Sequence, residues 1–100
     1  MLDAREAAFL GLLKKLSVNT VGGWVLATVF WEHATGLGYY PRDLRPDGRT
    51  TLDHLLEHEF LEHNPQYKIE GGVHYGSARL TEKGKQALSD MEVEPKAGDL

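Results

Sequence analysis

The side chains with the clearest chemical potential are two histidines and a glutamate in the middle of the chain. His54, Glu57 and His58 follow the pattern His-x-x-Glu-His. Residues four apart lie on one face of a helix, so the two imidazoles could bind one divalent cation while Glu57 acts as a general base. Glu62 extends the same stripe by another turn. These residue types at this spacing are suited to metal-assisted hydrolysis.

The rest of the sequence does not supply what such an enzyme needs. The chain has 100 residues, enough for one compact domain with one core, whereas peptidases with this motif surround the metal with a cleft and a distant further ligand. There is no cysteine, which excludes disulfides and thiolate chemistry and indicates a reducing compartment. We therefore predict no catalysis, no cofactor and no metal site. The alternative is metal binding by His54, His58 and Glu62.

Composition and charge indicate a globular domain with an acidic end. Apolar residues make up 41% of the chain and charged residues 26%, and the formal net charge is −4. Residues 90–100 hold four acids and one lysine, so we predict a domain over residues 1–91 and a flexible acidic tail over residues 92–100. No stretch approaches the roughly 20 apolar residues of a membrane span, and the N-terminus lacks secretory features. We expect a cytoplasmic protein without a membrane partner.

Apolar spacing predicts three helices before any strand. Asp3 is the expected N-cap of the first helix, with Glu6 as its capping-box partner. The second segment has β-branched and aromatic residues that could suit a strand, but its length favours a buried helix. Leucines line the buried face of the third helix. The predicted helices span residues 3–16, residues 21–34, and a segment from Thr50 or Thr51 to about Glu62.

The segments on either side of the third helix predict a loop and a hairpin. Two prolines and three glycines in residues 36–49 forbid a continuous helix. Residues 66–70 alternate in polarity, and Gly71-Gly72 suits a two-residue turn. The return strand follows over residues 73–80, with a bulge near Gly76-Ser77.

A last helix is expected over residues 82–91, capped by Thr81. Gly84 weakens this helix intrinsically, which indicates a close approach to another backbone. Because a lone hairpin is marginal in water, it must pack against the helices. The element order therefore predicts a mainly α fold with a small β-hairpin (α+β), as in a winged helix-turn-helix.

One segment carries a family likeness. Residues 78–88, ARLTEKGKQAL, resemble the second wing strand and following helix of winged-helix regulators of the PadR and MarR type. In those families a strand ending in Leu-Thr is followed by a charged pair and glycine. Residues 49–56, RTTLDHLL, lie where PadR-like proteins have their recognition helix. The resemblance covers roughly residues 5–90 and implies a transcriptional regulator that binds double-stranded DNA as a homodimer.

A DNA-binding function assigns roles to ten residues. Those at the start and free face of the third helix would meet base edges, and the cations would grip the phosphate backbone. The alternative is that the threonines are caps and the arginines pair with nearby aspartates. The predicted DNA-binding residues are Arg42, Arg45, Arg49, Thr50, Thr51, His54, Lys68, His74, Arg79 and Lys83.

The charges of the third helix leave a second function open. Residues 41–63 contain three arginines and six acids, and phosphate binding depends on cations. A winged-helix module whose acidic face binds a basic protein partner is therefore the alternative.

Overall fold

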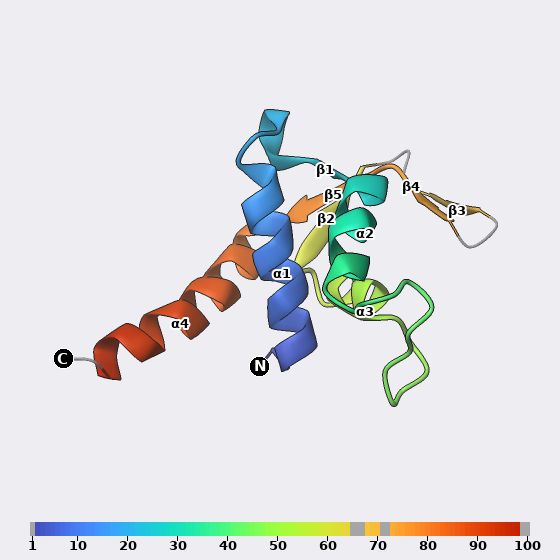
Figure 1. Ribbon diagram of the computed structural model, residues 1–100. Helices are drawn as coiled ribbons and strands as arrows, with labels where there is room; N and C mark the ends of the chain where they lie inside the picture. Colours follow the sequence, from blue (N-terminus) through green and yellow to red (C-terminus); the bar gives the residue numbers. More distant parts are fainter. Residues whose placement is uncertain (1, 65–67, 71–72, 99–100) are drawn as a thin grey trace.

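The computed structural model describes the backbone of residues 2–64, 68–70 and 73–98, and the side chains of residues 2–64 and 76–91. Within these residues the chain is a small α+β domain with four α-helices and a three-stranded antiparallel sheet (Figure 1). None of the helices described has the length and apolar character of a membrane span. The elements are α1 (Ala4–Ser17), η1 (Val21–Gly23), β1 (Val25–Leu26), α2 (Ala27–Gly36), α3 (Thr51–Glu57), β2 (Leu61–His63), β3 (Lys68–Glu70), β4 (Val73–Tyr75), β5 (Ser77–Leu80) and α4 (Glu82–Gly98).

The first helix forms as the sequence predicts. The Asp3 carboxylate accepts the Glu6 N–H at 2.8 Å, and the Glu6 carboxylate accepts the Asp3 N–H at 3.0 Å. This reciprocal pair is the expected capping box, so it is confirmed. Phe9, Leu10 and Leu13 are buried along one side of α1. The helix therefore supplies one wall of the core.

The segment predicted as one helix over residues 21–34 forms three elements instead. Gly22 and Gly23 have φ values of 68° and 78°, in the left-handed region, and form the single turn of η1. Val25 and Leu26 then pair with β5, and α2 begins only at Ala27. The prediction is wrong over residues 21–26 because the two glycines interrupt the helix and the sheet satisfies the backbone that follows them.

The second helix ends at glycine. Its last residue is Gly36, and Gly38 follows with a φ of 92°. The Gly38 N–H donates to the Thr35 carbonyl and the Tyr39 N–H to the Ala34 carbonyl, both at 3.0 Å. These two bonds form a Schellman motif, which turns the chain into the loop before α3.

The third helix is shorter than predicted. It ends at Glu57 rather than near Glu62, and Glu59 takes a φ of 64° that reverses the chain. Leu61 begins β2, where it is 2% exposed. A buried leucine satisfies the apolar pattern of a helix and of a strand equally, so the pattern alone did not separate them.

The sheet places β5 in the middle, with the strand order β1-β5-β2. Leu61 pairs with Leu80, and Val25 pairs with Ala78. Strands β3 and β4 form a separate two-stranded extension, in which Ile69 pairs with His74. The predicted hairpin is thus confirmed over residues 68–70 and 73–75, while its turn lies outside the described residues. Its return strand was expected to continue to residue 80, but Ser77–Leu80 pairs with β1 and β2 instead. The sheet of the body was not predicted, because β1 and β2 were both assigned to helices.

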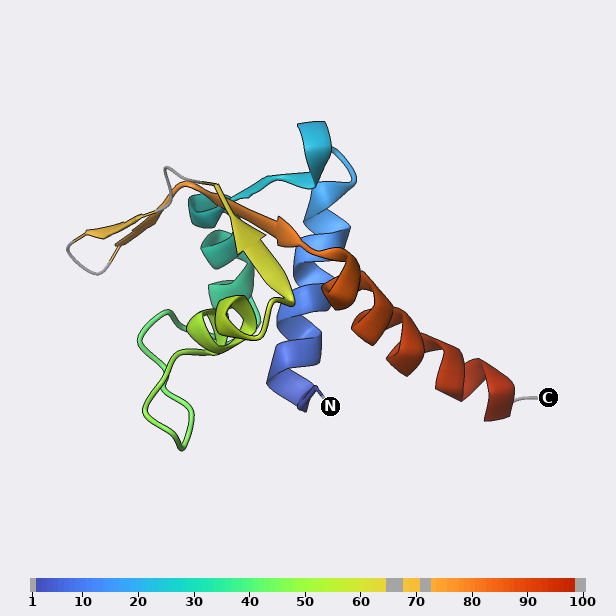
Figure 2. The same cartoon turned by 180° about the vertical axis from the view of Figure 1, so that it is seen from behind.

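The last helix begins where predicted but extends further. Thr81 precedes it, and its hydroxyl accepts the Gly84 N–H at 3.0 Å. The helix runs to Gly98 rather than Met91 and leads away from the body (Figures 1 and 2). A Cβ on Gly84 would lie 2.0 Å from the Phe60 carbonyl oxygen, so the predicted close approach is confirmed.

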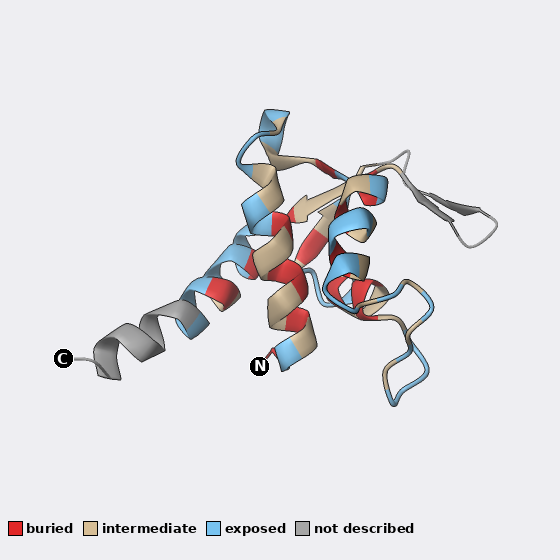
Figure 3. Ribbon diagram, viewed as in Figure 1, coloured by how far each residue is buried: buried red, intermediate tan, exposed pale blue. Residues whose placement is uncertain are grey.

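The core lies between α1, α2, α3 and the sheet (Figure 3). Phe9 is its aromatic centre, because it makes edge-on contacts with Phe30, Trp31 and Tyr39 at centroid distances of 5.2–5.7 Å. The buried apolar residues are Leu2, Phe9, Leu10, Leu13, Val25, Ala27, Phe30, Ala34, Leu52, Leu55, Leu61, Leu80 and Leu88.

Candidate nucleic-acid interface

The two threonines at the start of α3 lie in different environments. The Thr50 hydroxyl accepts the Asp53 N–H at 3.1 Å, so Thr50 is the cap. Thr51 is only 2% exposed, and its hydroxyl has no hydrogen-bond partner among the described residues. Its expected place on the free face of the helix is therefore wrong, because the first residue after the cap points into the core here.

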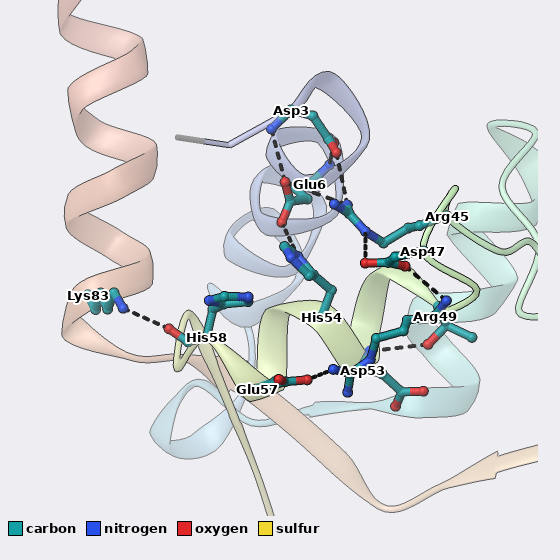
Figure 4. A network of polar contacts seen from close by, with 11 residues as sticks. Asp3, Glu6, Arg45, Asp47, Arg49, Asp53, His54, Glu57, His58 and Lys83 are labelled. Atoms are coloured by element: carbon teal, nitrogen blue, oxygen red, sulfur yellow. Dashed lines mark hydrogen bonds and ion pairs between the residues drawn. The ribbon is translucent and has the colours of Figure 1, made fainter.

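His54 faces α1 rather than solvent. Its side chain is 20% exposed, and Nδ1 lies 2.7 Å from Oε2 of Glu6 (Figure 4). The Glu6 side chain is 3% exposed, so this carboxylate is buried and needs partners. The expected solvent-facing position of His54 is wrong for that reason. The contact ties α3 to the first turn of α1.

Arg45 joins the same network from the loop. Its Nη1 lies 2.9 Å from Oδ2 of Asp3 and 3.7 Å from Oε1 of Glu6, and its Nε lies 3.7 Å from Asp47. Its side chain is 19% exposed. The alternative interpretation, in which the loop arginines pair with aspartates, is confirmed for Arg45. Together these contacts hold the loop and α3 against the N-terminal end of α1.

The contacts of this network shift the pKa values of three of its charged groups. Burial raises the pKa of Asp3, but the Glu6 N–H and the Arg45 guanidinium lower it by more, so it lies below 3.8. The Arg49 N–H is the main group that lowers the pKa of Asp47. Burial lowers the pKa of Arg45, but the surrounding carboxylates raise it by more. Both aspartates are thus held ionised.

Acid should weaken the domain through these two aspartates. A carboxyl whose pKa is depressed on folding contributes stability that is complete above its unfolded pKa and is lost as the pH falls through its folded pKa. We expect stability to fall as the pH drops below the unfolded value of 3.8, and Asp3→Asn to flatten this dependence. Urea unfolding at a series of pH values measures it. Asp90→Asn, on the exposed side of α4, is the control, and an equal slope in the two variants would contradict the assignment.

Arg42 and Arg49 are the more exposed loop arginines. Arg49 forms an ion pair with Glu57, and their side chains are 45% and 50% exposed. Arg42 is exposed, with its guanidinium 6.0 Å from the centre of the Tyr40 ring. Exposed ion pairs contribute about 0–1 kcal/mol. Both guanidinium groups can therefore exchange their present contact for a phosphate at low cost.

Arg79 lies at the other end of α1. Its Nε donates to Glu62 at 2.5 Å and its Nη1 to the Gly22 carbonyl at 2.9 Å. Its guanidinium carbon lies 4.3 Å from the centre of the Trp24 ring. Arg45 contacts the first turn of α1 and Arg79 contacts η1, which follows its last turn, and 14 helical residues span about 20 Å. The structure does not bring these two arginines together.

Of the three predicted residues that remain, the structure describes the side chain of Lys83 alone. The Lys83 ammonium donates to the His58 carbonyl at 2.8 Å and lies 4.9 Å from the centre of the Phe60 ring. Lys68 and His74 lie in β3 and β4, and their side chains are outside the described residues.

The two histidines of the motif lie next to each other. The rings of His54 and His58 are 4.3 Å apart. Within residues whose side chains are described, no three histidine or acidic groups are placed to hold a metal ion.

Comparison of the chain with protein-family models, curated proteins and solved structures gives no match to any of them.

Proposed function

We propose that the domain is a winged helix that binds duplex DNA, acting as a homodimer. The observation that carries this proposal is the sheet order β1-β5-β2, in which a helix precedes β1, two helices separate β1 from β2, and a hairpin extension connects β2 to β5. The extension β3–β4 and the loop between α2 and α3 project to the same side of the body in both views (Figures 1 and 2). A duplex could contact both projections, with the start of α3 facing a groove.

The contact set is narrower than the ten predicted residues. Arg42, Arg49 and Thr50 are accessible at the start of α3, and Lys68 and His74 on the hairpin remain predictions. Arg45 is committed to the acids of α1, and Arg79 is held by Glu62 at the opposite end of α1. These two are left out of the proposed interface, together with the buried Thr51. Two further residues are left out because they are engaged elsewhere, His54 with Glu6 and Lys83 with the His58 carbonyl.

The proposal implies that the affinity for DNA falls only gradually as the salt concentration rises. Each phosphate contact contributes a slope of about −0.9 to the plot of log affinity against log salt. With two accessible loop arginines and the hairpin cations, we expect a slope of about −2 to −4 per protomer. Fluorescence anisotropy with a labelled random duplex, from low to physiological salt, measures both affinity and slope. Absence of binding at low salt would end the proposal.

Removing the loop arginines one at a time tests which face of the domain contacts the duplex. Arg42→Gln and Arg49→Gln should each weaken binding to any duplex severalfold and reduce the slope by about one unit. Lys15→Gln is the matched control, because Lys15 is exposed in the last turn of α1, far from the start of α3. A loss as large in the control as in the two arginine variants would place the duplex elsewhere.

One observation favours the second function, binding of a basic protein partner through α3. The Asp53 carboxylate has no ion pair among the described residues, and Glu59 is exposed with a left-handed backbone at the end of the helix. The variant Asp53→Asn with Glu59→Gln separates the two functions. Binding of DNA by α3 requires the variant to bind DNA more tightly, because two opposing charges are gone. An unchanged or absent affinity for DNA favours the protein-binding function.

A further inference from the structure

A cavity opens at the end of the molecule away from the start of α3. Its volume is about 470 Å³, within the usual range of 300–1,000 Å³ for small-molecule sites. The last turn of α1, the glycines of η1, the end of β5 and the first turn of α4 all contribute to its wall. Together with Glu62 of β2, these elements come from three separate stretches of the sequence and converge on one space of ligand size.

Arg79 is fixed in the wall of this cavity before any ligand arrives. The Trp24 ring holds one face of its guanidinium group, Glu62 binds Nε, and the Gly22 carbonyl binds Nη1. Nη2 makes no hydrogen bond to the described residues, so its two N–H donors remain for a ligand. A guanidinium group held in one orientation binds an oxyanion with little loss of side-chain entropy.

One cation of the wall is held only weakly. Lys85 lines the cavity together with its partner Glu82. The Lys85–Glu82 contact is 3.4 Å long, and the two side chains are 60% and 93% exposed. Such a pair contributes at most about 1 kcal/mol, so Lys85 can turn to a ligand from the wall opposite α1.

The glycines of η1 form part of the wall without adding a side chain to it. A side chain on Gly23 would meet open space, and one on Gly22 would approach Trp24 and Arg79 at 3.3 and 3.8 Å. Leu80 and the methylene groups of the lysines add apolar surface. The wall thus offers a charged anchor beside a region that accepts an uncharged body.

We propose that this cavity binds a small organic anion, a carboxylate or a phosphate monoester, with Arg79 as its principal anchor. A carboxylate or phosphate oxygen is the partner that a guanidinium N–H donor favours, and the planar group holds its donors in a fixed direction that a lysine cannot reproduce. The site is independent of the proposed DNA binding, because it requires none of the residues of that interface. A negative result for either leaves the other unaffected.

Nuclear magnetic resonance titration tests the site with named probes. Benzoate and phenyl phosphate are added separately to the full chain, with sodium chloride at equal ionic strength as the reference. We expect saturable shifts of the Arg79 Nε–H and of the Gly22 and Gly23 amides, and the tighter probe identifies the preferred anion. Shifts that rise linearly and match those in chloride would overturn the proposal.

Variants make the test specific. Arg79→Lys should weaken probe binding about tenfold, because it keeps the charge but loses the planar donors, and Lys85→Gln should weaken it about threefold. Lys15→Gln, exposed on α1 but outside the cavity, should bind like the parent. If Arg79→Lys fails to fold, as judged by circular dichroism, Lys85→Gln carries the test. Equal affinity in Lys85→Gln and Lys15→Gln would then contradict the site.

Discussion

Gly84→Ala should reduce the free energy of unfolding by about 3 kcal/mol or more, a large part of the stability of a domain of this size. The added Cβ would lie 2.0 Å from the Phe60 carbonyl oxygen and 3.0 Å from its carbon. Neither atom belongs to a flexible side chain, so α4 and the segment before β2 would have to separate. Overpacking of this kind exceeds the small gain in helix propensity that alanine brings.

The segment that would be displaced is held at several points. The Thr81 hydroxyl donates to the Glu59 carbonyl at 2.5 Å, and the Thr81 N–H donates to the Phe60 carbonyl at 3.2 Å. Glu59 has a positive φ, a backbone conformation that needs support from its surroundings. Moving α4 away from Phe60 would stretch these bonds, so the steric cost cannot be relieved by a local shift.

Gly11→Ala is the matched control. Gly11 lies inside α1, and a Cβ there would meet nothing within 4 Å. Alanine should therefore stabilise the domain by about 0.5–1 kcal/mol through its helix propensity. Urea unfolding of both variants measures the contrast. Similar stabilities for Gly84→Ala and Gly11→Ala would contradict the close contact between α4 and the segment before β2.

Local capping signals predicted where α1, α3 and α4 begin. The Asp3–Glu6 capping box, a cap at Thr50 or Thr51 and the Thr81 cap were each predicted from residues whose chemistry acts over a few positions. The strands β1 and β2 were missed because each is two or three residues long and is formed by pairing with β5, more than 15 residues further along the chain. Pairing at that distance leaves no periodic pattern in so short a segment.

The expected exposure of two candidate side chains was wrong because both contact a buried acid. Arg45 and His54 look like surface residues in a polar stretch, but both turn toward Glu6. A signal for this was present in α1: Leu2, Glu6, Phe9 and Leu13 share the helical spacing of one face. An acid within an apolar stripe is buried, and it therefore requires cationic partners from elsewhere in the chain.

Glu6→Ala should accordingly destabilise the domain by about 3 kcal/mol, at the lower end of the range for breaking a buried ion pair. Its loss removes half of the capping box and leaves His54 without its carboxylate partner, while Arg45 keeps Asp3 and Asp47. The Arg45 and His54 side chains are 19% and 20% exposed, so water can partly replace the carboxylate, which limits the cost. Glu57→Ala removes a carboxylate from the exposed pair with Arg49 and should cost less than about 1 kcal/mol.

A double-mutant cycle separates the network from the cap. Glu6→Ala and His54→Ala, measured singly and together by urea unfolding, should show a coupling energy of about 1 kcal/mol or more, because the two groups touch at 2.7 Å. The capping contribution is present in both arms of the cycle and cancels. A coupling energy near zero, or equal losses for Glu6→Ala and Glu57→Ala, would mean that the buried carboxylate does not hold α3 in place. Since Thr50 caps α3 and Arg49 directly precedes it, a real coupling makes Glu6 a positioning residue for the proposed interface.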